Sequence, residues 1–176
     1  VLTIDSSSKA DPIRNIRVIM PGFEETDYEE NPFHPLFLER LEGFKSLRFM
    51  NWMRSGTNLI DWADSATPQS VSQSWNHIGV APIYMCQLSN SLNADAWICV
   101  SYKASDDYIA GLANLMSKNL NSDLKLYVEY SNEFWNYQFP QATYSSEMGT
   151  AEGLGGGDGF KANLQYNARR SAQIFQ

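Results

Sequence analysis

The order of short apolar runs and longer amphipathic segments is the feature that most limits how this chain can fold. Apolar or β-branched runs at residues 16–20, 46–53, 96–100 and 124–131 have the composition and length of strands. Helical spacing of apolar residues follows each run, at residues 35–44, 82–92, 106–120 and from 160 to the end. Strands that alternate with helices form parallel sheets with right-handed crossovers. We therefore expect an α/β fold of four consecutive βα units, either in a doubly wound open sheet or in part of a (β/α)₈ barrel.

Two helices carry a capping residue, and two further segments are expected to be loops. Ser105 and Asp158 stand directly before helical segments, where a side-chain oxygen can accept N–H groups of the first turn. Residues 54–79 are rich in Ser, Thr, Asn and Pro, and loops of this length often carry function. The glycine-rich residues 153–159 are expected to be a connector, because no Lys-Ser or Lys-Thr follows them. We expect one domain over residues 1–176, in which residues 1–15 are a polar lead-in.

Charge and composition exclude several classes of partner. The 176 residues carry a net charge of -7, and because phosphate binding needs clustered Lys and Arg, we expect no nucleic acid partner. No run of 18 apolar residues exists, so we expect no membrane partner and no membrane span. The N-terminus has no basic region followed by an apolar stretch, so a secretion signal is either absent or already removed.

Cofactor and metal motifs are missing as well. No glycine-rich nucleotide-binding motif follows any predicted strand. His34 and His77 have no spacing partners for a metal site, and His34, just before a helix, is expected to be a surface or capping residue. Cys86 and Cys99 are expected to be small buried residues. The sequence thus predicts neither a metal nor an organic cofactor.

A carboxylate stands at the end of the fourth predicted strand, where parallel α/β folds gather their chemistry. Because side chains alternate along a strand, Tyr127, Glu129, Ser131 and Glu133 are expected on one face. Glu129 would lie deeper and needs a partner, for which Arg48 on the second strand is the candidate. Glu129 and Glu133 would lie roughly 13 Å apart at about 3.3 Å per residue. That separation exceeds the about 5 to 9.5 Å between the two carboxyl groups of glycosidases, so these two are not such a pair.

The segment YVEYSNEFWN, residues 127–136, resembles the fourth-strand signature of clan A glycoside hydrolases, which are retaining enzymes built on a (β/α)₈ barrel. The resemblance implies that Glu133 is the general acid/base, that Asn132 contacts the sugar 2-hydroxyl, and that Arg48 is the clan's second-strand arginine. Other segments also look like cellulase-like proteins of this clan, over most of residues 13–176: IRVIMPGF, NPFHPLFLERL, LRFMNWM, DDYIAGLANLMSKNL and NARRSAQIF.

The sequence departs from this family in two ways. Relatives often have Asp where Asn51 stands, and a Pro-His pair where this chain has Ser101-Tyr102, so contacts with substrate differ there. A full barrel takes about 250 residues, and the clan's nucleophilic Glu comes from a seventh strand that the matched part does not contain. The expected architecture is therefore half of a barrel, which a homodimer closes about a two-fold axis. A fragment of a longer enzyme and an open four-stranded sheet are the alternatives.

The resemblance implies that the protein is a secreted retaining enzyme that hydrolyses a β-linked glycan, most simply cellulose. Residues expected to contact the substrate, besides the catalytic Glu133, are Asn132, Trp135, Trp52, Arg48, Tyr102 and Asn51. Trp62 and Trp75 are as readily explained by core packing, and Glu147 and Glu152 as solvated loop charges. The alternatives are a half-barrel that binds carbohydrate without cleaving it and an inactive fragment.

Overall fold

The computed structural model describes residues 3–24, 26–54, 59–74 and 78–176. The chain divides into two compact units, Val1–Arg40 and Leu41–Gln176, and each is described by itself. The described part of the first unit is irregular up to α1 (Pro35–Leu41), a helix that runs one residue into the second unit. His34 precedes α1, and its Nδ1 accepts the N–H of Leu36 at 3.1 Å, as expected of a capping residue.

Residues 16–20 are irregular, so the strand predicted there is not formed. Their apolar side chains face solvent, with Val18 90% exposed and Ile16 and Met20 more than half exposed. A β-branched apolar run supplies the side chains of a buried strand, but a strand also requires a neighbour to receive its backbone hydrogen bonds. The prediction of a strand at residues 16–20 was therefore wrong, because no described strand lies beside this segment to pair with it.

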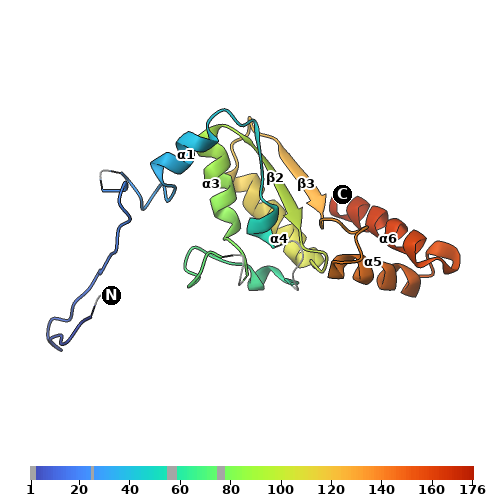
Figure 1. The fold of residues 1–176 in the computed structure, drawn as a ribbon, viewed down its shortest axis with the longest axis horizontal. Helices are drawn as coiled ribbons and strands as arrows, with labels where there is room; N and C mark the ends of the chain where they lie inside the picture. Colours follow the sequence, from blue (N-terminus) through green and yellow to red (C-terminus); the bar gives the residue numbers. More distant parts are fainter. Residues whose placement is uncertain (1–2, 25, 55–58, 75–77) are drawn as a thin grey trace. The chain divides into compact units, whose positions relative to one another are not determined.

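The second unit is an α/β fold with a three-stranded parallel sheet in the order β1-β2-β3 (Figure 1). The strands are β1 (Ser46–Arg48), β2 (Asp95–Val100) and β3 (Leu126–Tyr130). The connections and the C-terminal part contain α2 (Met50–Met53), η1 (Trp62–Asp64), α3 (Pro82–Leu92), α4 (Asp106–Asn119), α5 (Pro140–Ala151), η2 (Gly155–Gly157) and α6 (Gly159–Ile174). The predicted α/β class with parallel strands is confirmed. The described residues contain three strands where four were predicted.

The second predicted strand, residues 46–53, is a strand only as far as Arg48 and then turns into α2. Phe49 donates its N–H to the carbonyl of Trp97 at 2.8 Å, and Met53 then bonds back to Phe49 at 3.0 Å. Phe49 and Met53 are both buried, four residues apart, which is helical spacing. Because the apolar run is continuous, the sequence does not show where the period changes from that of a strand to that of a helix.

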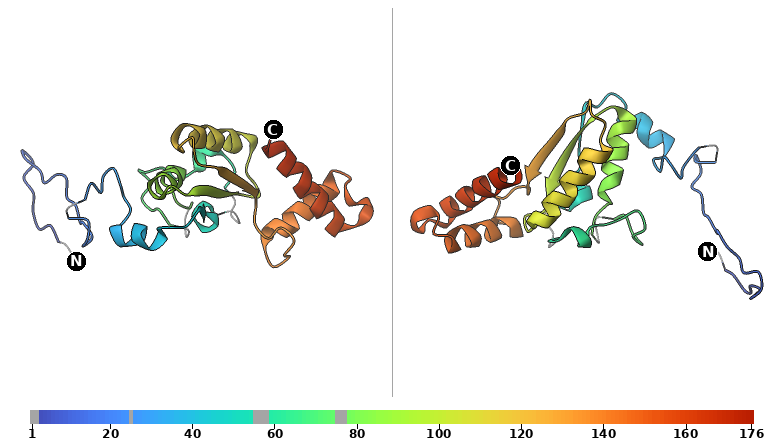
Figure 2. Two further views of the ribbon diagram at one scale, coloured as in Figure 1. Left: turned by 90° about the horizontal axis from the view of Figure 1, so that it is seen from above. Right: turned by 180° about the vertical axis from the view of Figure 1, so that it is seen from behind.

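The sheet has one apolar face and one polar, aromatic face. The apolar face carries the buried Leu47, Ala96, Ile98 and Val100. Figure 2 shows α3 and α4 side by side against one face of the sheet, and the Cys86 Sγ of α3 lies 3.3 Å from the Met116 Sδ of α4. Both cysteines are free and fully buried, as predicted. In the register Arg48↔Trp97↔Tyr127 and Cys99↔Glu129, the alternate side chains form the other face.

The helix α5 was not predicted, because it has almost no apolar side to produce a period. Its buried residues are instead small or polar: Gln141, Ala142, Ser145 and Gly149. Small residues let two helices approach closely, and a side chain at Gly149 would collide with the carbonyl oxygen of Ala162 in α6. The available signal was Pro140 in the first turn, together with small residues one and two turns later.

The predicted caps of α4 and α6 are confirmed. Ser105 Oγ accepts the N–H of Tyr108 at 3.1 Å, and Asp158 Oδ1 accepts the N–H of Phe160 at 2.9 Å. However, α6 buries Ala162, Asn163, Tyr166 and Asn167, while the apolar Phe160 and Leu164 stay exposed. None of the helices within the described residues is long and apolar enough to cross a membrane.

Candidate functional site

Glu133 lies in a tight turn directly after β3, between residues whose backbone groups are fixed. Ser131 has φ of 63° and Glu133 has φ of 47°, both in the left-handed region that costs a non-glycine residue roughly 1–2 kcal/mol. Such conformations persist only where surrounding contacts hold them, and they cluster at functional sites. Here the Ser131 N–H donates to the carbonyl of Val100 at 2.8 Å, which continues the sheet by one residue.

Asn136 fixes both the backbone and the side chain of Glu133. Its N–H donates to the Glu133 carbonyl at 2.9 Å, and its Nδ2 donates to Glu133 Oε2 at 2.9 Å. The other carboxyl oxygen, Oε1, has no partner among the described residues. A carboxyl group held at one oxygen and open at the other can give or take a proton at the open oxygen.

Arg48 and Glu129 form a two-pronged ion pair across the sheet, as predicted. Arg48 Nη2 lies 2.9 and 2.8 Å from the two Glu129 oxygens, and its Nε lies 3.1 Å from Oε2. The same Nη2 donates to Asn132 Oδ1 at 2.9 Å. Because Arg48 occupies the amide oxygen of Asn132, the amide Nδ2 is the group left to meet a ligand. Within the described residues this Nδ2 has no partner.

Two neutral groups of β2 complete the surroundings of Glu129. Trp97 Nε1 donates to Glu129 Oε2 at 3.0 Å, and Cys99 Sγ donates to the same oxygen at 3.3 Å. Burial, and next the charge of Glu129, raise the pKa of the Cys99 thiol to about 12, so the thiol stays protonated and acts as a donor. Glu129 is therefore a structural anion with its oxygens already engaged.

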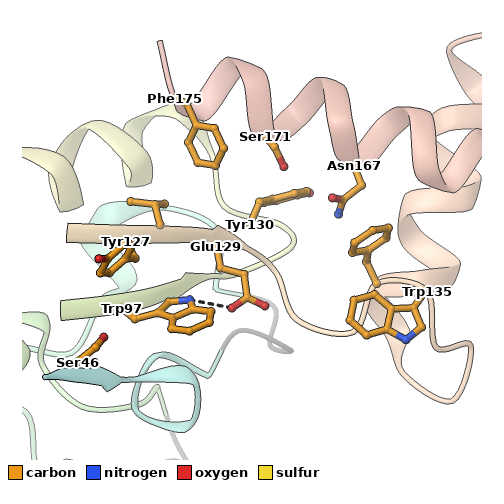
Figure 3. A pocket seen from close by; sticks show the side chains of 11 residues that line it. Ser46, Trp97, Tyr127, Glu129, Tyr130, Trp135, Asn167, Ser171 and Phe175 are labelled. Atoms are coloured by element: carbon orange, nitrogen blue, oxygen red, sulfur yellow. Dashed lines mark hydrogen bonds between the residues drawn. The ribbon is translucent and has the colours of Figure 1, made fainter. Parts of the chain in front are cut away.

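A cavity of about 610 Å³ opens along the free edge of β3 (Figure 3). Aromatic rings form much of its lining, and Glu129 is the carboxylate in it. The lining residues are Ser46, Trp97, Tyr127, Val128, Glu129, Tyr130, Phe134, Trp135, Asn167, Ser171 and Phe175. Trp135, a predicted substrate contact, is 55% exposed here. Glu133 and Asn132 do not line the cavity. They lie in the turn between β3 and the two lining residues Phe134 and Trp135.

The other predicted substrate contacts lie apart from this cavity. Asn51 is exposed on α2, and Trp52 is half-buried with its ring 5.3 Å from that of Phe49. Tyr102 is buried and packs edge-on against Tyr144 at 5.1 Å, while its carbonyl accepts the hydroxyl of Tyr130 at 2.7 Å. The structure thus joins Arg48 to Asn132, the residue before Glu133. It does not bring Asn51, Trp52 or Tyr102 to the cavity.

The weaker candidates from the sequence have structural surroundings. Trp62 packs against Tyr108 at 5.7 Å, in agreement with the core-packing interpretation. Glu147 is exposed on α5 and not in a loop, whereas Glu152 lies in the turn after α5, where it forms an ion pair with Arg169 of α6. Trp75 and His77 lie outside the described residues.

Sequence reasoning missed four residues that shape this site. Trp97 and Cys99 share the polar face of β2, and pairing the strands in register would have placed them beside Glu129. Gln141 and Asn163 donate to the backbone carbonyls of Asn132 and Phe134, at 2.6 and 2.8 Å. No local pattern signals this, because both belong to helices whose buried faces are polar.

In the described part of the chain, no group of three or more His, Cys, Asp or Glu side chains is arranged to hold a metal ion. Comparisons of this chain with protein families, with curated proteins and with solved structures gave no match.

Proposed function

We propose that this chain is a retaining glycoside hydrolase that acts on a β-linked polysaccharide, with Glu133 as the general acid/base. The observation that carries the proposal is the group Arg48–Asn132–Glu133 at the carboxyl end of a parallel strand, the end at which α/β folds place their chemistry. Arg48 orients the Asn132 amide so that its Nδ2 can bind a sugar hydroxyl. Glu133 has one carboxyl oxygen without a partner among the described residues, and in this proposal that oxygen protonates the leaving oxygen.

The reaction requires a second carboxylate, and Glu129 does not qualify. Retention of configuration needs two carboxyl groups about 5–5.5 Å apart, one of which is a free nucleophile. Both Glu129 oxygens are bound by Arg48, and one also accepts from Trp97 and Cys99. We propose that a second copy of the chain supplies the missing carboxylate, in a homodimer in which two half-barrels close about a two-fold axis.

The half-barrel is the finer architecture of this proposal. Support comes from the two edges of the sheet, β1 and β3, neither of which has a further partner strand among the described residues. Open edges of a parallel sheet are normally covered or paired.

The substrate class follows from the cavity beside the turn. Sugar rings stack on aromatic faces, and the cavity is lined by Trp97 of β2, Tyr127 of β3 and Trp135 in the segment after β3. The aromatic lining suits an uncharged β-1,4-glycan. Because an enzyme encounters such a polymer outside the cell, we include secretion in the proposal. Two carboxyl groups perform this chemistry without a metal or an organic cofactor.

The test is release of reducing ends from carboxymethyl-cellulose by the wild type and by Glu133→Gln, beside the mass of each protein in solution. The expected result is hydrolysis by the wild type at twice the chain mass of 19.9 kDa. Glu133→Gln keeps that mass and loses at least about 100-fold in rate. Wild type that is folded, dimeric and inactive on β-glycans would overturn the enzymatic proposal.

One observation favours a second candidate, carbohydrate binding without hydrolysis. The aromatic cavity exists in a single chain, and Glu133 does not line it. Calorimetric titration with cello-oligosaccharides separates the two candidates. Binding that Trp135→Ala abolishes, with no product formed by the wild type, would favour the binding protein.

A further inference from the structure

The three carbonyl groups around Glu133 are each held by a side chain or backbone amide from a different element. Gln141 of α5 donates Nε2 to the Asn132 carbonyl at 2.6 Å. Asn136 donates its backbone N–H to the Glu133 carbonyl at 2.9 Å. Asn163 of α6 donates Nδ2 to the Phe134 carbonyl at 2.8 Å. The carbonyls of residues 132 and 134 are therefore held by helices outside the turn, and the carbonyl of Glu133 is held from within it.

We infer that Gln141 and Asn163 are positioning residues for the Glu133 carboxyl group. This inference rests on the proposed function for its catalytic part, while its structural part concerns the turn alone. The two amides act through the backbone and touch no reacting atom.

Burial supports a specific role for these two amides. Gln141 is 3% exposed and Asn163 is fully buried. Burial of an amide lowers the stability of the fold unless the amide forms hydrogen bonds. In each case the amide nitrogen bonds to the turn, while Gln141 Oε1 and Asn163 Oδ1 have no partner among the described residues. The bond to the turn is thus what each amide contributes within the described structure.

The left-handed backbone at Ser131 and Glu133 explains why such bonds are needed. Without outside contacts, a non-glycine residue leaves this region for the common β or α regions, and its side chain then points elsewhere. With the carbonyls of residues 132 and 134 fixed, rotation at Glu133 would break at least one of the two bonds. Glu133 is held in one direction by helices that lie after it in the sequence.

The composition of α5 and α6 fits the same role. Both helices bury polar residues on the faces where helices normally bury apolar ones, while Phe160 and Leu164 of α6 remain exposed. A helical hairpin that served only to cover the sheet would turn its apolar side inward. This hairpin turns its amides inward, toward the turn that carries Glu133.

The experiment uses Gln141→Met and Asn163→Leu, which keep side-chain size and remove the amide N–H groups. Ser145→Ala is the matched control, because Ser145 is buried one turn after Gln141 and its hydroxyl makes no hydrogen bond among the described residues. Asn163→Ser is the second variant if the leucine does not fold. Two readouts are taken: hydrogen exchange of the amides of residues 133–136, and kcat, KM and the pH profile on an aryl β-cellobioside.

The expected result is at least about tenfold faster exchange at residues 133–136 in both amide variants, with exchange in β2 unchanged. We expect kcat to fall about 10–100-fold with KM within about twofold, and the alkaline limb of the pH profile to shift. Ser145→Ala stays within about twofold of the wild type in every readout.

Two results would overturn the inference and are distinct from failure of the proposed function. If exchange at residues 133–136 is unchanged in the folded variants, the amides do not hold the turn, whatever the activity. If exchange rises but kcat is unchanged in an active enzyme, the turn is held without positioning Glu133. Wild type without hydrolysis, combined with faster exchange in the variants, would remove the proposed function and leave the role of the amides in the turn.

Discussion

At the residue scale, two carboxylates four residues apart have very different surroundings. Glu129 accepts from Arg48, Trp97 and Cys99, whereas the Glu133 carboxyl group accepts, among the described residues, from Asn136 alone. Differences of this kind are how one site assigns a fixed charge to one carboxyl group and proton transfer to another. The strand register creates the difference, because it puts Arg48, Trp97 and Cys99 on the face of Glu129.

Replacement of Arg48 tests the role of this ion pair. Arg48→Met leaves Glu129, whose side chain is 27% exposed, without its cationic partner and frees the Asn132 amide. We expect the free energy of unfolding to fall by about 1–3 kcal/mol in urea titrations. Arg14→Met, which removes an exposed pair with Asp11, should change it by less than about 0.5 kcal/mol. Equal effects of the two substitutions would show that the Arg48 pair is no more than a surface contact.

The buried thiols predict loss of stability at alkaline pH. Burial raises the pKa of Cys86 to about 11 and, together with the charge of Glu129, that of Cys99 to about 12, from an ordinary value of 9.0. Above pH 9 the unfolded thiols lose protons that the folded ones keep, so the free energy of unfolding falls as pH rises toward 11–12.

Urea titrations at pH 8 and pH 10 check this. The wild type should lose about 1 kcal/mol more per thiol over that interval than the double variant Cys86→Ala, Cys99→Ala. The same pH dependence in both proteins would show that the thiols are not responsible.

At the scale of elements, the α5–α6 hairpin depends on close backbone approach at Gly149. Its α-carbon faces the carbonyl of Ala162, and any side chain there must push the helices apart. Gly149→Val should lower the free energy of unfolding by about 2–3 kcal/mol. Glu147→Ala, an exposed change on the same helix, is the control and should stay within about 0.5 kcal/mol. A stable Gly149→Val protein with unaltered activity would contradict the close packing and its link to the turn.

The elements also show how far the sequence predicts this fold. The strands β2 and β3, the helices α3 and α4 and both caps depend on local patterns, and all of these were predicted to within a few residues. Residues 16–20 depend on a neighbouring strand, which their own composition does not supply. The helix α5 buries small and polar residues, which meet α6 at Gly149 and the turn at Gln141, so no apolar period marks it. The Arg48–Glu129 pair could be predicted because side chains alternate along a strand. Gln141 and Asn163 could not, because no local pattern marks a buried amide on a helix.

At the scale of the whole molecule, the sheet of the second unit ends in two edges. Ala96 donates its N–H to the Lys125 carbonyl and Ser131 to that of Val100, so residues 125 and 131 face β2. By strand alternation the N–H and C=O groups of Leu126, Val128 and Tyr130 point the other way. This free edge, next to the aromatic cavity, fits a chain whose site is completed by a second copy.

The most direct test of the account is the dependence of the Glu133→Gln effect on the leaving group. A general acid matters most when the departing oxygen is strongly basic and least when it is a good leaving group. On aryl β-cellobiosides, we predict that Glu133→Gln slows cleavage at least about 100-fold for a phenol leaving group and less than about tenfold for 2,4-dinitrophenol. An equal loss with both leaving groups, or no loss with either, would contradict the assignment of Glu133 as the acid/base.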